Sequence, residues 1–227
     1  MKRKKRGLLT MFAGLLLIAA ALFLTGYNIW EQKQADEAAS SVLQTLTANM
    51  ERTADSEPAK QPDQNPLPEE EALLEAVPPP FVQHPDMQMP QTEIEGNWYI
   101  GVLEIPALNL ALPIMGDWTY EQLKIAPCRY TGSVYSGDAV ICGHNYDRHF
   151  GSLKDLSIGE KIRFTDMDGN VFVYSLCAQQ SLHKTAVSEM IAQSGDWDLT
   201  LFTCTPGGQT RATVRCKLES YQWNRPQ

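Results

Sequence analysis

Basic residues are scarce in this chain beyond its first six positions. Five of the 19 Lys and Arg residues lie in residues 2–6, which leaves 14 basic residues against 27 acidic ones in the rest of the chain. A nucleic-acid-binding surface needs a basic stripe, so we expect no nucleic acid among the partners. The chain also lacks internal repeats, so its globular part is expected to be one non-repetitive domain.

Charge is absent altogether from residues 8–30, which are almost wholly apolar. That length suffices to cross the hydrocarbon core of a bilayer as a helix, so we predict a transmembrane signal anchor at residues 7–30. A cleaved signal peptide is the alternative, but the run exceeds a typical h-region and no convincing small-x-small site follows it. By the positive-inside rule the basic residues 1–6 stay in the cytoplasm. The protein is then a single-pass protein of the cell membrane with its remaining domains outside the cell.

Residues 31–95 lack the pattern of a packed domain. Residues 31–52 carry Val42, Leu43, Leu46 and Met50 at helical spacing, which indicates a short stalk helix. Residues 53–92 are dominated by Pro, Glu, Gln and Asp and cannot bury enough apolar surface to offset the entropy of ordering. We therefore interpret residues 31–95 as an extracellular stalk followed by a disordered linker.

Residues 96–223 form the expected globular domain, and long helical patterns are missing from it. Short apolar or alternating runs bounded by turn residues predict strands at 98–105, 110–114, 138–143, 161–165, 171–179, 199–204 and 211–220. Only residues 119–125 and 186–193 suggest helices, both short. Residues 166–170 resemble the start of a calcium loop but lack its later glutamate, so they are predicted to form a hairpin turn. The pattern favours a mainly β barrel or sandwich.

Three side chains in this domain have the chemistry needed to attack an amide. Cys204 ends one predicted strand and offers a thiol nucleophile, His144 follows another strand and offers an acid or base, and Arg211 begins the last strand and offers hydrogen-bond donors for an oxyanion. A six-residue loop joins the last two strands, so Cys204 and Arg211 should meet at one end of a sheet. His144 joins them only if its strand runs parallel to the Cys204 strand.

These segments resemble the sortases, the membrane-anchored cysteine transpeptidases of the Gram-positive cell surface. Residues 200–204 match the family's Thr-Leu-x-Thr-Cys signature, Gly143-His144-Asn145 is similar to its histidine segment, and Arg211 before an apolar strand resembles its essential arginine. The resemblance spans roughly residues 97–220. It implies a closed eight-stranded sortase-type β-barrel with short helices and no cofactor or bound metal.

The resemblance also implies an activity and its partners. Cys204 would cleave a C-terminal sorting motif similar to Leu-Pro-x-Thr-Gly in surface proteins or pilins, through a thioester acyl-enzyme. The acyl group would pass to an amine of a peptidoglycan precursor or of a pilin lysine. His144 would protonate the leaving amine and deprotonate the incoming one, Arg211 would hold the oxyanion, and residues 186–197 would contribute to the substrate wall. Sortase subclass, motif and acceptor stay open.

Several alternatives remain at this point. Arg215 also lies on the predicted polar face of the last strand and is the fallback for Arg211. Cys128, Cys142, Cys177 and Cys216 are expected to be free thiols, although the extracellular compartment permits disulfides. A cell-wall cysteine peptidase is a rival, but such enzymes usually place their cysteine upstream of the histidine. A non-catalytic tethered surface module would need none of the three side chains.

Overall fold

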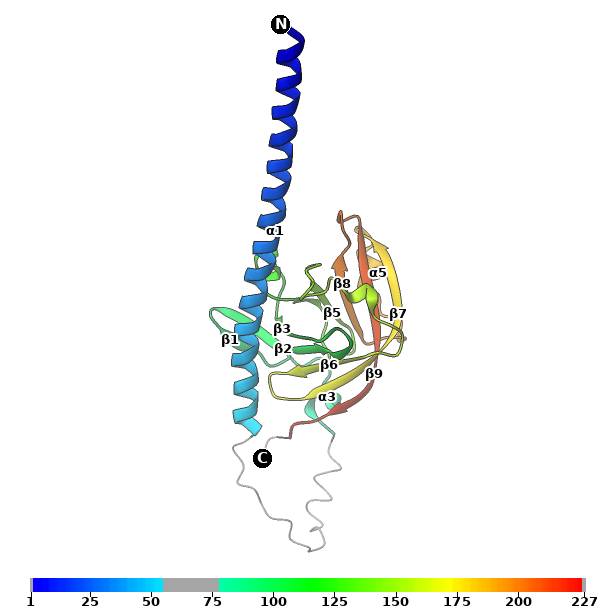
Figure 1. Cartoon of the computed structure of the whole chain (residues 1–227). Coiled ribbons are helices and arrows are strands. Elements are labelled where there is room, and N and C mark those ends of the chain that lie inside the picture. The colour runs from blue at the N-terminus through cyan, green and yellow to red at the C-terminus, as the bar shows by residue number, and fades with distance from the viewer. Residues whose placement is uncertain (1, 55–77, 226–227) are drawn as a thin grey trace, which may run out of the picture.

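A long helix lies alongside a β barrel in the computed structural model of the chain (Figure 1). The structure describes residues 2–54 and 78–225. Helix α1 (Lys2–Ala54) joins the predicted apolar span and the predicted stalk helix without a break. By length and composition it is the one helix among the described residues that is able to cross a membrane, a test that both an anchor and a signal sequence pass.

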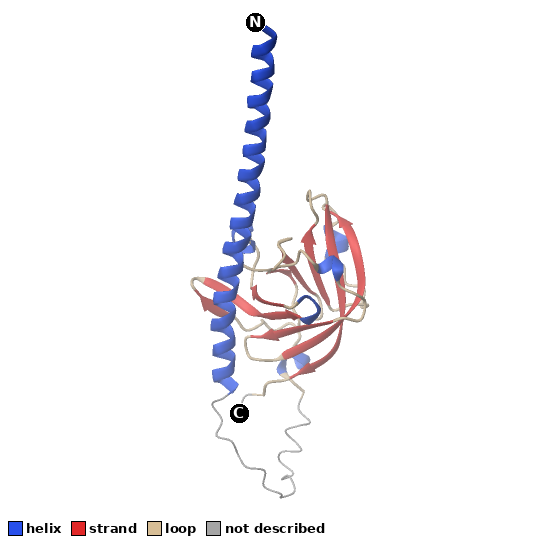
Figure 2. Cartoon of the chain, viewed as in Figure 1, coloured by secondary structure: helices blue, strands red, loops and turns tan. Residues whose placement is uncertain are grey.

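The domain that follows is built from strands with only short helices between them (Figure 2). The helices are α3 (Pro80–Gln83), α4 (Tyr120–Leu123), α5 (Val187–Met190) and the 3₁₀ turns η1 (Pro106–Leu108) and η2 (Leu153–Asp155). The strands are β1 (Thr92–Ile94), β2 (Asn97–Ile105), β3 (Leu110–Met115), β4 (Cys128–Thr131), β5 (Ala139–Gly143), β6 (Lys161–Asp166), β7 (Val171–His183), β8 (Leu199–Cys204) and β9 (Thr210–Gln222).

Eight of these strands close into a ring, as the family resemblance implied. The order is β2-β3-β4-β5-β8-β9-β7-β6, and β6 pairs back onto β2, while β1 adds to the outside of β2. The seam between β2 and β6 requires glycine at position 101, because a Cβ there would collide with the carbonyl oxygen of Thr165 and the ring of Phe164. The β2–β6 pairing covers two strand edges that would otherwise be open to edge-to-edge association.

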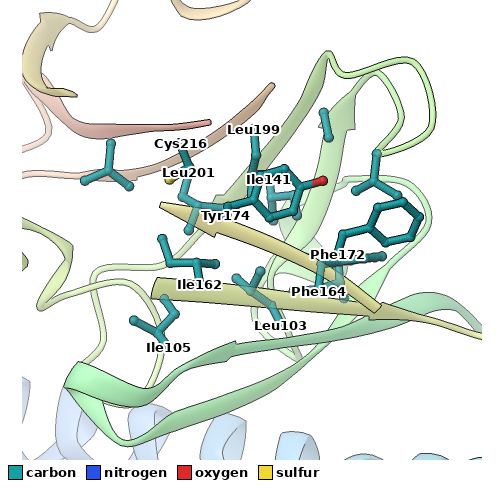
Figure 3. Packing of buried hydrophobic residues seen from close by; sticks show 14 of the residues in the cluster. Leu103, Ile105, Ile141, Ile162, Phe164, Phe172, Tyr174, Leu199, Leu201 and Cys216 are labelled. Atoms are coloured by element: carbon teal, nitrogen blue, oxygen red, sulfur yellow. The ribbon is translucent and has the colours of Figure 1, made fainter. Parts of the chain in front are cut away.

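The inside of the ring is filled by alternate residues of the strands. Figure 3 shows Leu103 of β2 and Ile162 of β6 packing beneath Leu199 and Leu201 of β8, and all four side chains are buried. Such alternation is expected where one face of a strand meets the core and the other meets solvent. The dense interior holds the ends of β5, β8 and β9 in fixed positions, and these ends carry the candidate site.

The segment before residue 96 differs from the predicted linker. Of that linker, residues 55–77 lie outside the described part of the chain. The segment after them packs on the barrel: Phe81 is buried and stacks on Tyr135 with 5.1 Å between ring centroids, and Met89 is also buried. The high Pro and Gln content of this segment favoured a linker, although the segment contains two large apolar side chains that pack on the barrel. The domain is therefore covered at one end by chain that the composition alone assigned to a spacer.

The predicted hairpin between residues 161 and 183 is confirmed by the antiparallel pairing of β6 and β7. Its turn is organised by the buried carboxylate of Asp166, which accepts hydrogen bonds from the backbone N–H of Asp168 (3.0 Å) and Asn170 (2.9 Å) and from the hydroxyl of Tyr135 (2.6 Å). These donors occupy the carboxylate that a calcium loop would offer to its ion.

Candidate active site

The three predicted side chains come from the same ends of three neighbouring strands. β8 lies between β5, to which it is parallel, and β9, to which it is antiparallel. Thr203 pairs with Gly143, so the next residue along each strand brings Cys204 beside His144. On the other side Cys204 pairs directly with Arg211. The parallel pairing that the sequence could only state as a condition is present, and it places the backbone of Cys204 between those of His144 and Arg211.

A tight loop after β5 fixes the backbone of His144. The carbonyl of His144 accepts a hydrogen bond from the backbone N–H of Phe150 (3.0 Å), and a Cβ on Gly143 would lie 2.6 Å from the Phe150 ring. A Cβ on Gly151 would lie 2.8 Å from the carbonyl oxygens of Asn145 and Tyr146. Both glycines are therefore required by close approach, and the loop is folded back on the end of β5.

The imidazole of His144 lies in a partly apolar environment. Its ring stacks on Tyr146 with 4.6 Å between centroids and an interplanar angle of 20°. Burial lowers the pKa of His144, the ammonium of Lys124 lowers it further, and the carboxylate of Glu31 opposes both. At neutral pH the resting imidazole is therefore mainly uncharged and able to accept a proton.

A second histidine lies behind the first one. His149 is 1% exposed, and neither of its ring nitrogens has a hydrogen-bond partner among the described residues. Burial and the nearby His144 lower its pKa to about 4, so it stays neutral at physiological pH. Its ring centroid lies 5.5 Å from that of Tyr146 with an interplanar angle of 47°, so Tyr146 contacts both imidazoles. No pattern in the sequence indicated this group of three rings.

The loop between β8 and β9 orients Arg211. Its Nη1 donates hydrogen bonds to the carbonyl oxygens of Gly208 (3.0 Å) and Thr210 (3.1 Å). Gly207 and Gly208 both have positive φ angles, which turn the chain sharply enough for the loop to close. Within the described residues only Nη1 of this half-buried guanidinium donates hydrogen bonds, although the group has five N–H donors. The remaining donors are available to an oxyanion.

A groove of about 170 Å³ runs beside Cys204 and Arg211. Its surface is mainly apolar and aromatic, and His144 does not line it. The lining residues are Trp118, Tyr120, Leu123, Tyr130, Cys142, His183, Lys184, Ala186, Val187, Met190, Phe202, Cys204 and Arg211. Three of them, Ala186, Val187 and Met190, belong to the segment that the family resemblance assigned to the substrate wall. The aromatic part, which sequence reasoning missed, comes from residues between β3 and β5 and from β8.

Arg215 is not on a solvated face as its alternation predicted. It is 1% exposed, and its guanidinium donates to the carbonyls of Met190 (2.8 Å) and Glu189 (2.6 Å) and to the hydroxyl of Thr200 (2.6 Å). The ring of Trp197 lies 4.6 Å from its Cζ. Helix α5 and the segment after it cover this part of β9, so Arg215 ties the groove wall to the sheet.

The remaining cysteines are free thiols in the structure. Cys128 and Cys142 face each other across β4 and β5, and burial raises the pKa of Cys142 to about 12. Cys177 is exposed, so it is the natural control for thiol chemistry at Cys204. Within residues 2–54 and 78–225 no group of three or more His, Cys, Asp or Glu side chains is placed to hold a metal ion.

Comparison with known proteins bears on this arrangement. Residues 103–219 match the sortase domain family. Sortase D of Bacillus subtilis (strain 168) is 30% identical over 109 residues, which are 47% of this chain and 54% of that relative. The chain thus spans about half the length of the curated relative that it matches.

One solved structure shows the same fold: a Clostridium perfringens sortase D5 transpeptidase superposes with a TM-score of 0.54 at 18% identity, covering 81% of this chain and 99% of that one. Sortase C1 of Streptococcus agalactiae superposes with a TM-score of 0.49 at 23% identity, over 56% and 70% of the two chains. Because the family match covers more than half of this chain, the chain belongs to the sortase family of cysteine transpeptidases.

Proposed function

We propose that this chain is a membrane-anchored sortase in which Cys204, His144 and Arg211 act together. One observation carries the proposal: the register of three adjacent strands brings Cys204 between His144 and Arg211 at one end of the sheet, and Cys204 and Arg211 line an apolar groove. A nucleophile, a proton carrier and an oxyanion donor are the minimum set for acyl transfer through a covalent intermediate.

The acylation step starts from the thiolate of Cys204. It attacks the carbonyl carbon of the scissile amide, and the carbonyl oxygen becomes an oxyanion that the guanidinium of Arg211 stabilises by hydrogen bonds. The tetrahedral intermediate collapses by breaking its C–N bond. The imidazolium of His144 gives its proton to the leaving amine, and a thioester with Cys204 remains.

The second step reverses these roles. An acceptor amine attacks the thioester carbonyl and loses a proton to the neutral imidazole of His144, and the Cys204 thiolate leaves. Because burial lowers the pKa of His144, the neutral form needed here dominates at pH 7, while the imidazolium needed for acylation is the minor form.

The groove favours an apolar peptide segment ahead of the cleaved bond. The rings of Tyr130 and Phe202 meet edge to face with 5.5 Å between centroids, and the ring centroid of Trp118 lies 5.4 Å from that of Tyr130. These rings form an aromatic surface in the groove beside Cys204. Such a surface suits the Leu-Pro part of a sorting motif similar to Leu-Pro-x-Thr-Gly. Surface proteins or pilins would supply this motif, and a peptidoglycan precursor or a pilin lysine would supply the amine.

We further propose that α1 is retained as an anchor and that the barrel lies outside the cell. The basic cluster at residues 2–6 and the uncharged run at residues 8–30 support this orientation. The apolar side chains from Met11 to Trp30 that are described in the structure are largely exposed, as expected for a surface that meets lipid.

The test uses the full chain in nanodiscs with a library of fluorogenic sorting-motif peptides, with and without an amine acceptor. We expect a peptide thioester on Cys204 by mass spectrometry and an amide product when amine is present. Cys204→Ala should form neither, whereas Cys177→Ser should behave as the unmodified chain. Hydrolysis alone with every amine would favour the cysteine peptidase, and the absence of any acyl-enzyme would favour a non-catalytic module.

A further inference from the structure

The half of α1 that follows the apolar run is attached to the barrel along one face. Ala35, Ala39, Val42 and Leu46 are buried, and their spacing of four, three and four residues places them on one stripe of the helix. Residues between them, such as Gln44, are exposed. The stripe gives the helix a fixed rotational position relative to the barrel.

The surface that receives this stripe is continuous with the candidate site. Val42 and Leu46 pack in one cluster with Met115 of β3 and with Cys142 of β5, two residues before His144. Nearer the apolar run, Ala39 borders a cavity shared with Leu112 and with the loop that follows His144. The helix therefore contacts β3 and reaches the histidine loop, so the anchor and the barrel form one body.

The candidate site lies at the membrane end of this body. Glu31 is the first charged residue after the apolar run, and its carboxylate acts on the imidazole of His144 and on the phenol of Tyr146. In Figure 1 the loop between β8 and β9 points along α1 toward the N-terminal end of that helix, while β9 ends at the opposite end of the barrel. Several large apolar side chains near the groove are also exposed, among them Trp118 and Tyr120, the latter at 73%.

From this geometry we propose that docked α1 holds the catalytic end of the barrel against the outer phospholipid surface. The lipid headgroup layer is then the partner of this end, and both reactants reach Cys204 from the membrane side. Exposed Trp and Tyr side chains suit such a layer, because their rings are amphipathic and favour the interface. This proposal rests on the retained anchor of the proposed function, but not on the transpeptidase chemistry.

Energy transfer from the barrel to the lipid surface tests the orientation. The full chain with Cys177→Ser and Cys204→Ser is labelled with a donor at Gln209→Cys, an exposed position at the catalytic end, or at Asp168→Cys at the other end. The 13 residues of β7 separate these ends by about 40 Å. In phosphatidylglycerol nanodiscs with an acceptor-labelled headgroup, we expect several-fold higher transfer from position 209. Equal transfer, or more from position 168, overturns the proposal.

Two insertions distinguish a docked helix from a free tether. Seven helix-forming residues between Trp30 and Glu31 lift the barrel by about 10 Å and keep the helical face, because seven residues make nearly two turns. Transfer from position 209 should fall. The same seven residues inserted between residues 66 and 67 should leave it unchanged. If both insertions act alike, the barrel follows its linker and the proposal is wrong.

The stripe itself supplies a third test. Val42→Ser with Leu46→Ser removes apolar contacts between helix and barrel and should bring the transfer from positions 209 and 168 close together. The exposed Gln44→Ser is the matched control and should keep the difference. Intact mass of the chain reports anchor removal separately, and peptide cleavage is not needed for any of these readings. Loss of the anchor or of catalysis is therefore distinguished from failure of the orientation.

Discussion

Two arginines of β9 differ in how many of their hydrogen-bond donors are used by the protein itself. At the strand ends, Cys204 and Arg211 are half-buried, and within the described residues the guanidinium of Arg211 donates hydrogen bonds only to its own loop. Four residues further along β9, Arg215 is buried, donates hydrogen bonds to α5 and β8, and contacts the ring of Trp197. The same residue type thus serves two purposes on one strand. A side chain whose donors are used by the protein positions the groove, and one whose donors remain available can act on a substrate.

The largest expected effect comes from removing the available guanidinium. Arg211→Ala should lower the rate of acyl-enzyme formation by about 10²–10³-fold, the usual effect of deleting an oxyanion donor. Arg211→Lys should rescue little, because an ammonium lacks the forked donors of a guanidinium. Rapid-quench mass spectrometry of the thioester gives the rate. The melting temperature should stay within about two degrees of the unmodified chain. A large drop would mean that Arg211, like Arg215, mainly stabilises the fold.

Removing the buried guanidinium of Arg215 should lower stability more than it lowers the rate of acylation. Arg215→Met leaves the carbonyls of Glu189 and Met190 without their donor, which should lower the free energy of unfolding by about 2 kcal/mol. The groove wall then loosens, so KM should rise more than kcat falls. Urea unfolding and peptide kinetics measure the two effects. Arg163→Met is the control, since the side chain of Arg163 is exposed and forms a surface ion pair with Glu104. An Arg215→Met protein of normal stability with a large loss in kcat would return Arg215 to a catalytic role.

A smaller effect, on stability, is expected from substituting Gly143, the residue before His144. Gly143→Ala places a methyl group against Phe150 and should cost about 1 kcal/mol or more in stability, with a displaced histidine loop. Phe150→Leu in the same chain should recover part of the loss by giving the methyl group room. Thermal unfolding of the single and double variants provides the comparison. Additive losses would mean that the two residues do not meet as the structure has them.

The smallest expected effects are opposite shifts of one pKa. Glu31→Gln removes a carboxylate that favours the imidazolium, so the pKa of His144 should fall, and Lys124→Gln removes a repelling cation, so it should rise. The imidazolium fraction at pH 7 changes in the same directions. Histidine-selective NMR titration of the full chain in detergent micelles measures both, and His144→Gln assigns the signal. Shifts of the same sign in the two variants would contradict this arrangement of charges.

The sequence predicted the strands that carry the site because their signals are local. The run before His144, the segment that ends on Cys204 and the alternation after Arg211 each fall within one strand. Which strands become neighbours is not a local property, so the parallel pairing of β5 and β8 could be stated only as a condition. The family resemblance supplied that arrangement before the structure did.

Other features could not be predicted from the sequence because they depend on which segment covers a surface. Alternation along β9 assigned Arg215 to a polar face, and only the position of α5 shows that this face is closed. The short β4 (Cys128–Thr131) has too few residues for a periodic signal. The docking stripe of α1 includes Ala35 and Ala39, whose small side chains allow close approach but add little to a hydrophobic pattern. In each case burial was created by a distant segment.

The parallel pairing of β5 with β8 also affects the order in which activity can arise. The two strands are far apart in the sequence, and contacts between distant segments form late, since a long loop must close first. In the proposed orientation, residues around His144 would cross the membrane before Cys204, because they come first in the chain. Cys204 and His144 would then become neighbours only when the last strands enter the ring. Folding of the barrel outside the cell would therefore complete the proposed catalytic site.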